Sequence, residues 1–225
     1  MLDPVSTNET HFFREPRQFE FLENRVFAEW HAEAAAGLKP KRLRLWSAGC
    51  SSGEEPYSIA MLLLDHFPRH DGWELEIIAT DLSTRILDKA QAALWPVVKA
   101  QEIPEKYLKQ FMLRGTGSQD GKMKAGAEIR SLIQFERLNL NDERYPVTGR
   151  FDAIFCRNVL IYFDTPSRTR VIERLIDRLA PSGYLFVGHA ESLSGITDRA
   201  RHVMPTIYRL SADEPRNLAR ADAEL

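Results

Sequence analysis

The sequence lacks the long apolar segments of membrane-spanning and secreted proteins. Its longest uninterrupted apolar run, residues 59–64, is far shorter than the ~20 residues that a membrane-spanning helix requires. The opening residues Met1-Leu2-Asp3-Pro4 have neither the basic start nor the apolar stretch of a secretory signal. We therefore expect a cytoplasmic protein without membrane insertion.

The sequence also has few cysteines and almost no net charge. The 225 residues include two cysteines, Cys50 and Cys156, which form no Cys-x-x-Cys pair. They supply no disulfide framework, fit a reducing compartment and predict no metal site. Lys and Arg number 30 against 32 Asp and Glu, a net charge of −2, so we expect no nucleic-acid partner.

Short β-type runs alternate with helical patterns, which predicts an α/β fold with a doubly wound, mainly parallel sheet. Strands are expected at residues 42–47, 73–80, 132–138, 151–156, 184–187 and 206–210, and helices at 54–67, 83–94 and 166–179. A glycine-rich turn from Arg114 to Gly121 lies between two strand-like pieces, which predicts a small antiparallel insertion at about 107–130. We expect one domain over residues 1–210 and a polar, disordered tail over 211–225.

Ligands of open α/β sheets bind beyond the carboxyl ends of the strands, so a ligand site is expected in the loops there. After the first strand, Gly49 and Gly53 permit a tight turn and a close backbone approach to a ligand. The next helix opens with Glu54 and Glu55, which would repel a pyrophosphate and suit a cationic ligand. The alternative is that these carboxylates only complement the helix dipole.

Asp81 ends the second strand, where a carboxylate can accept hydrogen bonds from the vicinal hydroxyls of a ribose. The alternative is a helix N-cap, a position for which Ser83 competes. The first loop has no Gly-x-Gly-x-x-Gly, which argues against a nicotinamide cofactor. Together the two loops favour S-adenosylmethionine, which carries a sulfonium and an ammonium but no phosphate.

The loop after the fourth strand brings Arg157, Asn158 and Tyr162 to the centre of the sheet's rim. An active site is expected there. The alternatives are that Tyr162 is an aromatic core residue, Arg157 a surface cation and Asn158 a turn cap.

The segment ahead of the sheet combines two aromatic residues with a cation. Phe12 and Phe13 would anchor this arm to the core, and Arg14 would then be held where its guanidinium could meet a carboxylate.

Five motifs in this order resemble the CheR-type chemotaxis receptor methyltransferases, over about residues 7–210. They are Thr7-Asn8-x-Thr10-x-Phe12-Phe13-Arg14, Gly53-Glu54-Glu55-Pro56-Tyr57-Ser58, Ala79-Thr80-Asp81, the run from Phe151 to Val159 with Ile161-Tyr162-Phe163, and Gly188-His189-x-Glu191-Ser192. The resemblance implies a Rossmann-like class I methyltransferase fold with a small inserted β-subdomain. It also implies transfer of a methyl group from S-adenosylmethionine to receptor glutamates, giving methyl esters and S-adenosylhomocysteine.

The resemblance further implies site residues, to which the glycine loop adds Gly49. The implied cofactor contacts are Asn8, Thr10, Arg14, Glu55, Asp81, Asn139, Leu140, Arg157 and Asn158. Arg14 and Tyr162 are implied nearest the transferring methyl. A glutamate is ionised near neutral pH, so no strong base is needed, and catalysis would rest on aligning oxygen, carbon and sulfur.

Members of this family usually begin with a helical domain, whereas this chain starts six residues before Thr7. We therefore expect the catalytic domain alone. The Gly115-Thr116-Gly117 turn resembles the β-subdomain of members that dock a peptide from the receptor's C-terminus. The expected partners are the chemoreceptor cytoplasmic domain and this peptide. An alternative function is an S-adenosylmethionine-binding sensor or scaffold that methylates no receptor.

Overall fold

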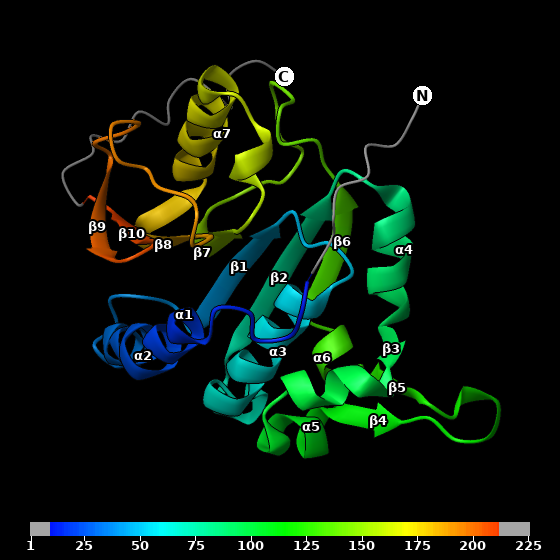
Figure 1. The fold of residues 1–225 in the computed structure, drawn as a ribbon. Coiled ribbons are helices and arrows are strands. Elements are labelled where there is room, and N and C mark those ends of the chain that lie inside the picture. The colour runs from blue at the N-terminus through cyan, green and yellow to red at the C-terminus, as the bar shows by residue number, and fades with distance from the viewer. Residues whose placement is uncertain (1–9, 212–225) are drawn as a thin grey trace.

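The computed structural model describes residues 10–211, which form a seven-stranded sheet and a three-stranded sheet with helices packed on them (Figure 1). The large sheet has the order β6-β2-β1-β7-β8-β10-β9. Its strands are β1 (Arg42–Ala48), β2 (Glu74–Asp81), β6 (Ile133–Arg137), β7 (Phe151–Cys156), β8 (Leu179–Val187), β9 (Ala200–Met204) and β10 (Ile207–Leu210). The helical segments are α1 (Pro16–Phe21), η1 (Leu22–Val26), α2 (Phe27–Ala35), α3 (Glu54–His66), η2 (Arg69–Asp71), α4 (Thr84–Ala92), η3 (Val97–Glu102), α5 (Glu105–Phe111), η4 (Gly117–Gln119), α6 (Ala127–Arg130), η5 (Leu160–Tyr162) and α7 (Thr165–Asp177).

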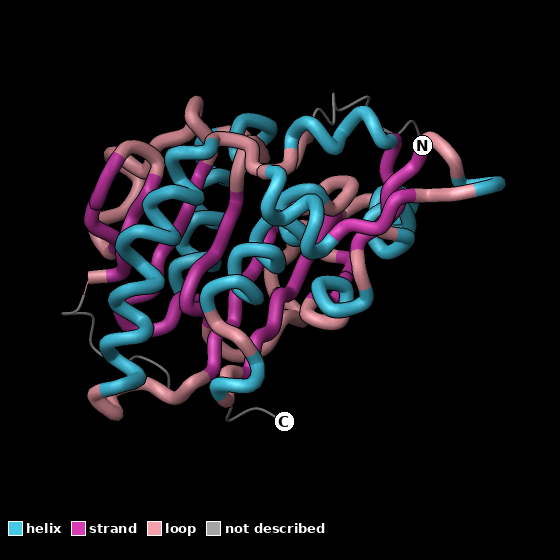
Figure 2. Tube along the Cα trace, turned by 90° about the horizontal axis from the view of Figure 1, so that it is seen from below, coloured by secondary structure: helices cyan, strands magenta, loops and turns pink. Residues whose placement is uncertain are grey.

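Alternation along the strands gives the large sheet two buried faces. In β1, Leu43 and Leu45 belong to one apolar cluster, and Trp46 and Ala48 belong to the other. Helices α1 to α4 contribute to the first cluster and α7 to the second, so the sheet is covered on both sides (Figure 2). Strands of a sheet that is covered on both faces are mostly apolar, and β7 is buried along its whole length, with Asp152 as its one charged residue.

The strand order places a topological switch between β1 and β7. From β1 the chain moves outward through β2 to β6, and it then returns to β7 on the other side of β1. These four strands and β8 pair in parallel, while β10 and β9 are antiparallel additions at the far edge. The loops that leave β1 and β7 therefore diverge and leave room for a ligand at their carboxyl ends.

The predicted α/β class and the small antiparallel sheet are confirmed. The small sheet has the order β3-β5-β4, with β3 (Leu94–Pro96), β4 (Met112–Arg114) and β5 (Lys122–Ala125). The glycine-rich turn connects β4 to β5 as expected. The sheet nevertheless begins at Leu94, before the expected range of 107–130, because the segment around Pro96, interpreted as a helix stop, continues as an edge strand.

Some expected boundaries are wrong. Strand β8 starts at Leu179, five residues earlier than the predicted 184, because the Pro-Ser-Gly sequence forms an irregularity inside the strand rather than a turn before it. Ser182 has a φ of 61°, and the β7–β8 register shifts between Phe151 and Ala153. Strand β9 and the helices of residues 16–35 were not predicted.

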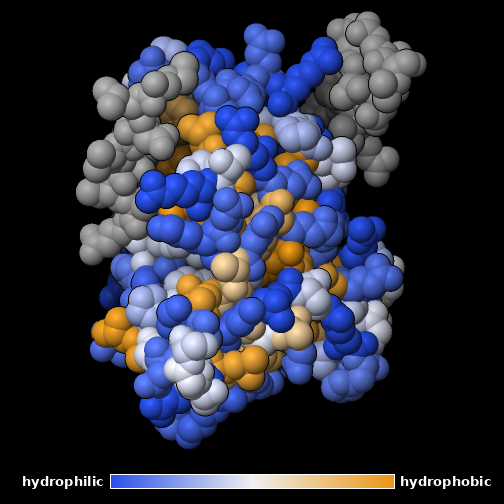
Figure 3. Space-filling view, turned by 90° about the vertical axis from the view of Figure 1, so that its right-hand side faces the viewer, coloured by the Kyte–Doolittle hydropathy of each residue, from blue (hydrophilic) through white to orange (hydrophobic). Residues whose placement is uncertain are grey.

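The surface on the side of α4 and the small sheet is mixed in polarity. Figure 3 shows apolar side chains there scattered among hydrophilic ones, and the exposed large apolar residues of this region are Leu94, Val97, Val98 and Leu113. Within residues 10–211, no helix has both the length and the apolar character needed to cross a bilayer. Residues 212–225 of the expected tail lie outside the described range.

Candidate functional site

A cavity of about 690 Å³ opens at the carboxyl ends of the parallel strands, in the size range of small-molecule sites. Its walls come from the arm ahead of α1 and from the loops after β1, β2, β6 and β7. Ten predicted site residues line it, namely Thr10, Arg14, Gly49, Glu55, Asp81, Asn139, Leu140, Arg157, Asn158 and Tyr162. Asn8 lies outside the described residues.

Asp81 joins the loops after β1 and β2. The Ser51 N–H donates to its Oδ2 at 2.9 Å, and the Ser83 N–H donates to its Oδ1 at 3.0 Å. The N-cap of α4 is Ser83, whose hydroxyl accepts from the Ile86 N–H, so the N-cap alternative for Asp81 is wrong. A carboxylate oxygen can accept more than one hydrogen bond, and Asp81 therefore retains acceptor capacity toward the cavity.

Gly49 lets the loops after β1 and β7 approach each other. Its φ is +84°, and a Cβ at this position would lie 2.5 Å from Cγ2 of Val159. A side chain would be strained by the backbone and would also push on the loop that carries Asn158. Only glycine satisfies both conditions here.

Replacing Gly49 with alanine is expected to cost more than the strain of a positive φ alone. A matched control is Gly72→Ala, because Gly72 has a φ of +83° and nothing within 4 Å of its Cβ position. Denaturant unfolding should show a loss of about 1–2 kcal/mol for Gly72→Ala. A loss larger by about 1–3 kcal/mol is expected for Gly49→Ala, because of overpacking. Equal losses would contradict the close approach to Val159.

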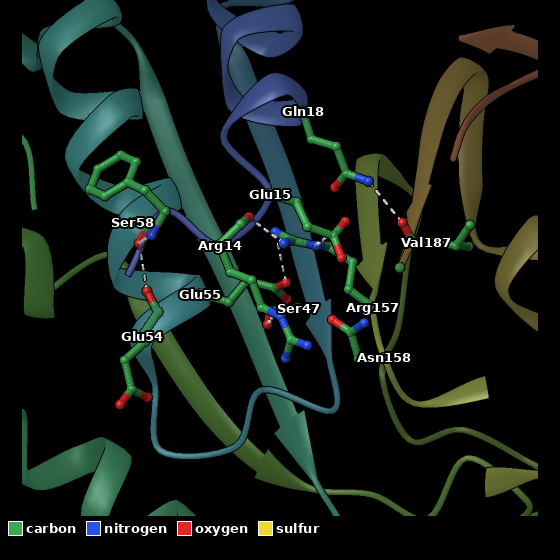
Figure 4. A network of polar contacts seen from close by, with 12 residues as sticks. Arg14, Glu15, Gln18, Ser47, Glu54, Glu55, Ser58, Arg157, Asn158 and Val187 are labelled. Carbon is green, nitrogen blue, oxygen red and sulfur yellow. Dashed lines mark hydrogen bonds and ion pairs between the residues drawn. The ribbon is translucent and has the colours of Figure 1, made fainter. Parts of the chain in front are cut away.

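Arg157 lines the cavity and is nevertheless buried. Its side chain is 2% exposed, so the alternative of a surface cation is wrong. Nη1 lies 3.4 Å from Oε2 of Glu55 and Nε lies 3.7 Å from Oε2 of Glu15, while Nη2 donates to the Arg14 carbonyl (Figure 4). The guanidinium also lies over the Phe19 ring at 5.5 Å. One buried cation therefore holds the arm, α3 and β7 together.

Glu55 and Glu54 point to different places. Glu55 lines the cavity, and its Oε1 accepts from the Ser47 hydroxyl at 2.6 Å. Burial raises the pKa of the Glu55 carboxyl, while Arg157 and the Ser47 hydroxyl act in the opposite direction. Glu54 is turned away from Glu55 (Figure 4). It pairs with Lys99 Nζ at 2.9 Å. Only one of the two glutamates is therefore available to a ligand.

The arm is anchored as the sequence predicts. Phe12 is 2% exposed and meets the Trp95 ring edge-on at 5.0 Å, and Phe13 stacks on Tyr107 at 5.6 Å. The Phe13 N–H also donates to the Ser58 hydroxyl at 3.0 Å. These contacts fix the backbone that carries Arg14 into the cavity wall.

The loop after β7 carries an exposed tyrosine. Tyr162 is 60% exposed and lines the cavity, so the alternative of a core tyrosine is wrong. Asn158 has a φ of 59°, which asparagine tolerates better than most residues.

Residues 139 and 140 were found only through the resemblance, although their position after β6 places them on the same rim. Sequence reasoning also missed further lining residues, which are His11, Phe19, Cys50, Ser51, Leu82, Leu138, Val159, Ile161 and Phe163. Most of them are next to predicted residues. Among the described residues, no group of three or more His, Cys, Asp or Glu side chains is arranged to hold a metal ion.

Comparison with known proteins gives one consistent match. A family model described as "CheR methyltransferase, SAM binding domain" matches residues 8–209, from the arm to β10. The chemotaxis protein methyltransferase of Borreliella burgdorferi is 37% identical over 210 residues, which cover 93% of this chain and 72% of that protein. Chemotaxis protein methyltransferase 2 of Pseudomonas aeruginosa is 38% identical over 207 residues, covering 92% and 71%. The Escherichia coli chemotaxis protein methyltransferase is 37% identical over 213 residues, covering 94% and 70%.

Proposed function

Because this chain belongs to the CheR methyltransferase family, we propose that it transfers a methyl group from S-adenosylmethionine to glutamate side chains of chemoreceptor cytoplasmic domains. The products are glutamyl methyl esters and S-adenosylhomocysteine. The observation that carries the proposal is the family match over residues 8–209, which include all four loops and the arm around the cavity. The three relatives are named as methyltransferases, which favours the enzyme over a sensor or scaffold.

The cavity suits a cationic nucleoside without phosphate. Both acidic residues of its wall, Glu55 and Asp81, can accept hydrogen bonds. The wall also includes Arg14 and Arg157, and Arg157 is paired with Glu15 and Glu55. Asp81 would hold the ribose hydroxyls, and Glu55 would face the positively charged methionine part. Asn139, Leu140 and Asn158 would complete the binding wall, together with Thr10 and Gly49. Asn8, which lies outside the described residues, is proposed as a further cofactor contact because of the family resemblance. When bound, S-adenosylmethionine supplies a methyl group activated by its sulfonium.

The reaction places modest demands on the chain. The substrate glutamate is already ionised near neutral pH and needs no base. The residues of the site must align its oxygen with the methyl carbon and exclude water. Arg14 would orient the incoming carboxylate, Tyr162 would donate a hydrogen bond to it at the mouth, and Arg157 would keep the Arg14 backbone in place.

A direct test uses purified protein, labelled S-adenosylmethionine and receptor cytoplasmic fragments. We expect label to enter the fragment as base-labile methyl esters. A fragment whose candidate glutamates are replaced by alanine should take up none. Saturable binding of S-adenosylmethionine without transfer to any fragment would instead support the sensor or scaffold.

Tyr162→Phe is expected to lower kcat while leaving cofactor binding intact. A hydrogen bond to a charged group contributes about 1.5–3 kcal/mol, so kcat should fall about 10- to 100-fold. Because Tyr162 is 60% exposed, stability should not change. The control is Tyr184→Phe, which removes a buried hydroxyl that donates to Glu29 at 2.7 Å, outside the cavity. Tyr184→Phe should lower stability and preserve kcat. A loss of stability with unchanged kcat in Tyr162→Phe, or a loss of kcat with unchanged stability in Tyr184→Phe, would contradict the catalytic role of Tyr162.

The small sheet is proposed to take the receptor's C-terminal peptide. β4 pairs only with β5, so its other edge can accept an added strand. The Gly115 N–H donates to the Lys122 carbonyl at 2.8 Å, which holds the glycine turn beside this edge. We place the protein in the cytoplasm with its receptor substrate, consistent with two buried free thiols among the described residues.

A further inference from the structure

Glu191 is a buried carboxylate beside the cavity rather than in its wall. It belongs to the fifth motif, Gly188-His189-x-Glu191-Ser192, to which the resemblance attaches no role. The residue is 6% exposed and does not line the cavity. Burial of a carboxylate lowers stability unless its oxygens accept hydrogen bonds, so the groups that donate to Glu191 indicate its role.

Four backbone N–H groups donate to this one carboxylate. Oε2 accepts from Asn158 at 3.0 Å and from Gly188 at 2.5 Å. Oε1 accepts from Leu160 at 2.7 Å and from Ile161 at 3.3 Å. Asn158 lies in the loop between β7 and η5, Leu160 and Ile161 are the first two residues of η5, and Gly188 follows β8, so none of the four donors is part of a strand. The carboxylate therefore satisfies N–H groups of the loop and of the first turn of η5 that have no strand or helix partner.

The loop that Glu191 holds is the one that carries the proposed catalytic tyrosine. Asn158 is in the left-handed region with a φ of 59°, a conformation that persists only where the surroundings fix it. Gly188 brings the second segment close, because a Cβ there would lie 2.7 Å from the Asn158 nitrogen and 2.9 Å from Glu191 Oε2. The approach is specific to glycine and leaves the loop little freedom.

We propose that Glu191 is a positioning residue for methyl transfer, whose carboxylate sets the conformation of residues 158–162 and so places Asn158 and Tyr162 at the cavity. This inference rests on the proposed function. Glu191 acts through the loop and touches neither the cofactor nor the reacting atoms.

The test variant is Glu191→Gln, which keeps the volume of the side chain. An amide supplies one acceptor oxygen and one NH₂ group, so in either orientation two of the four backbone N–H groups face a donor. Each lost hydrogen bond to a charged acceptor is worth about tenfold or more in an equilibrium. We expect the Kd for S-adenosylhomocysteine, measured by calorimetry, to rise and kcat to fall, each by about 10- to 100-fold.

A matched control is Asp152, which lies near the start of β7, at the end of that strand opposite to the segment that Glu191 holds. Asp152 is 8% exposed, accepts from the Arg44 N–H at 2.9 Å and pairs with Lys39, and does not line the cavity. Asp152→Asn should lower the Tm as Glu191→Gln does, yet leave Kd and kcat within about twofold of the unsubstituted protein. If Glu191→Gln changes only the Tm, Glu191 is structural and the inference is overturned.

A double-mutant cycle separates positioning from a general loss of structure. If Glu191 acts through Tyr162, Glu191→Gln and Tyr162→Phe combine less than additively on kcat, whereas Asp152→Asn and Tyr162→Phe combine additively. Additive effects of Glu191→Gln would contradict the inference. Hydrogen exchange gives a readout that does not need turnover: the amides of residues 158–162 should exchange faster in Glu191→Gln than in Asp152→Asn. Failure of the unsubstituted protein to bind S-adenosylhomocysteine would instead count against the proposed function.

Discussion

Arg157→Ala is expected to lower the free energy of unfolding by about 3–5 kcal/mol, the loss typical of breaking a buried charge pair from one side. The substitution leaves the Glu15 and Glu55 carboxylates buried without the guanidinium that lies between them. It also removes the hydrogen bond to the Arg14 carbonyl. Urea unfolding followed by circular dichroism measures the change, and calorimetry should show that binding of S-adenosylmethionine is lost.

The control for this substitution is Arg42→Ala. Arg42 also has two carboxylate neighbours, Glu74 at 3.9 Å and Glu76 at 3.6 Å, but its side chain is 55% exposed. Exposed pairs of this kind contribute about 0–1 kcal/mol, so the loss should be small. Similar losses of unfolding free energy for Arg157→Ala and Arg42→Ala would contradict the claim that burial makes the loss of Arg157 more costly. Arg157→Lys keeps the positive charge but lacks the planar guanidinium. Its loss in the free energy of unfolding should lie between those of Arg157→Ala and Arg42→Ala.

Asp81→Ala is expected to raise the Kd for S-adenosylmethionine about 100-fold or more. Two ribose hydrogen bonds to a charged acceptor contribute about 1.5–3 kcal/mol each, and 1.4 kcal/mol corresponds to a factor of ten. The substitution also releases the Ser51 and Ser83 N–H groups. Calorimetric titration measures the change directly.

Ser83→Ala distinguishes a ligand role for Asp81 from a helix-capping role. It keeps the Ser83 N–H that donates to Asp81 and removes only the hydroxyl that caps α4. Stability should fall by about 1 kcal/mol, as for other lost N-caps, while the Kd stays unchanged. An unchanged Kd in Asp81→Ala would refute the ribose assignment.

The sequence predicted the fold best where one pattern has one structural meaning. Five of the six residues of Phe151–Cys156 are apolar, turn residues bound the segment, and β7 occupies these residues. The start of β8 was mistaken because Pro181, Ser182 and Gly183 are typical of turns, and only the pairing with β7 makes them part of a strand. Residues 16–35 did carry a signal, since Phe19, Leu22, Val26 and Trp30 recur at helical spacing and are all buried.

The sequence indicated many of the residues that line the cavity but not how they are connected. Loops after parallel strands meet at one rim, so Gly49, Glu55 and Asp81 could be grouped from sequence. The pairing of Arg157 with Glu15 and the attachment of Glu191 to the loop after β7 join residues far apart in the chain. Nothing in the local sequence indicates which distant backbone amides a carboxylate will accept. These long-range contacts determine whether a residue binds the ligand itself or positions another residue that binds it.

The arm that carries Arg14 leaves the ribosome early, yet its partners are synthesised late. Arg157 donates to the Arg14 carbonyl across 143 residues, and Gln18 Nε2 donates to the Val187 carbonyl and the Thr206 hydroxyl across 169 and 188 residues. Contacts of such sequence separation are slow to form, and those of Gln18 exist only once β8 and the turn before β10 have been made. The lining residues of the cavity all precede β8, whereas the contacts that attach α1 through Gln18 require β8 and the turn before β10. A chain shortened from its carboxyl end would therefore lose the attachment of α1 before it loses any described residue of the cavity wall.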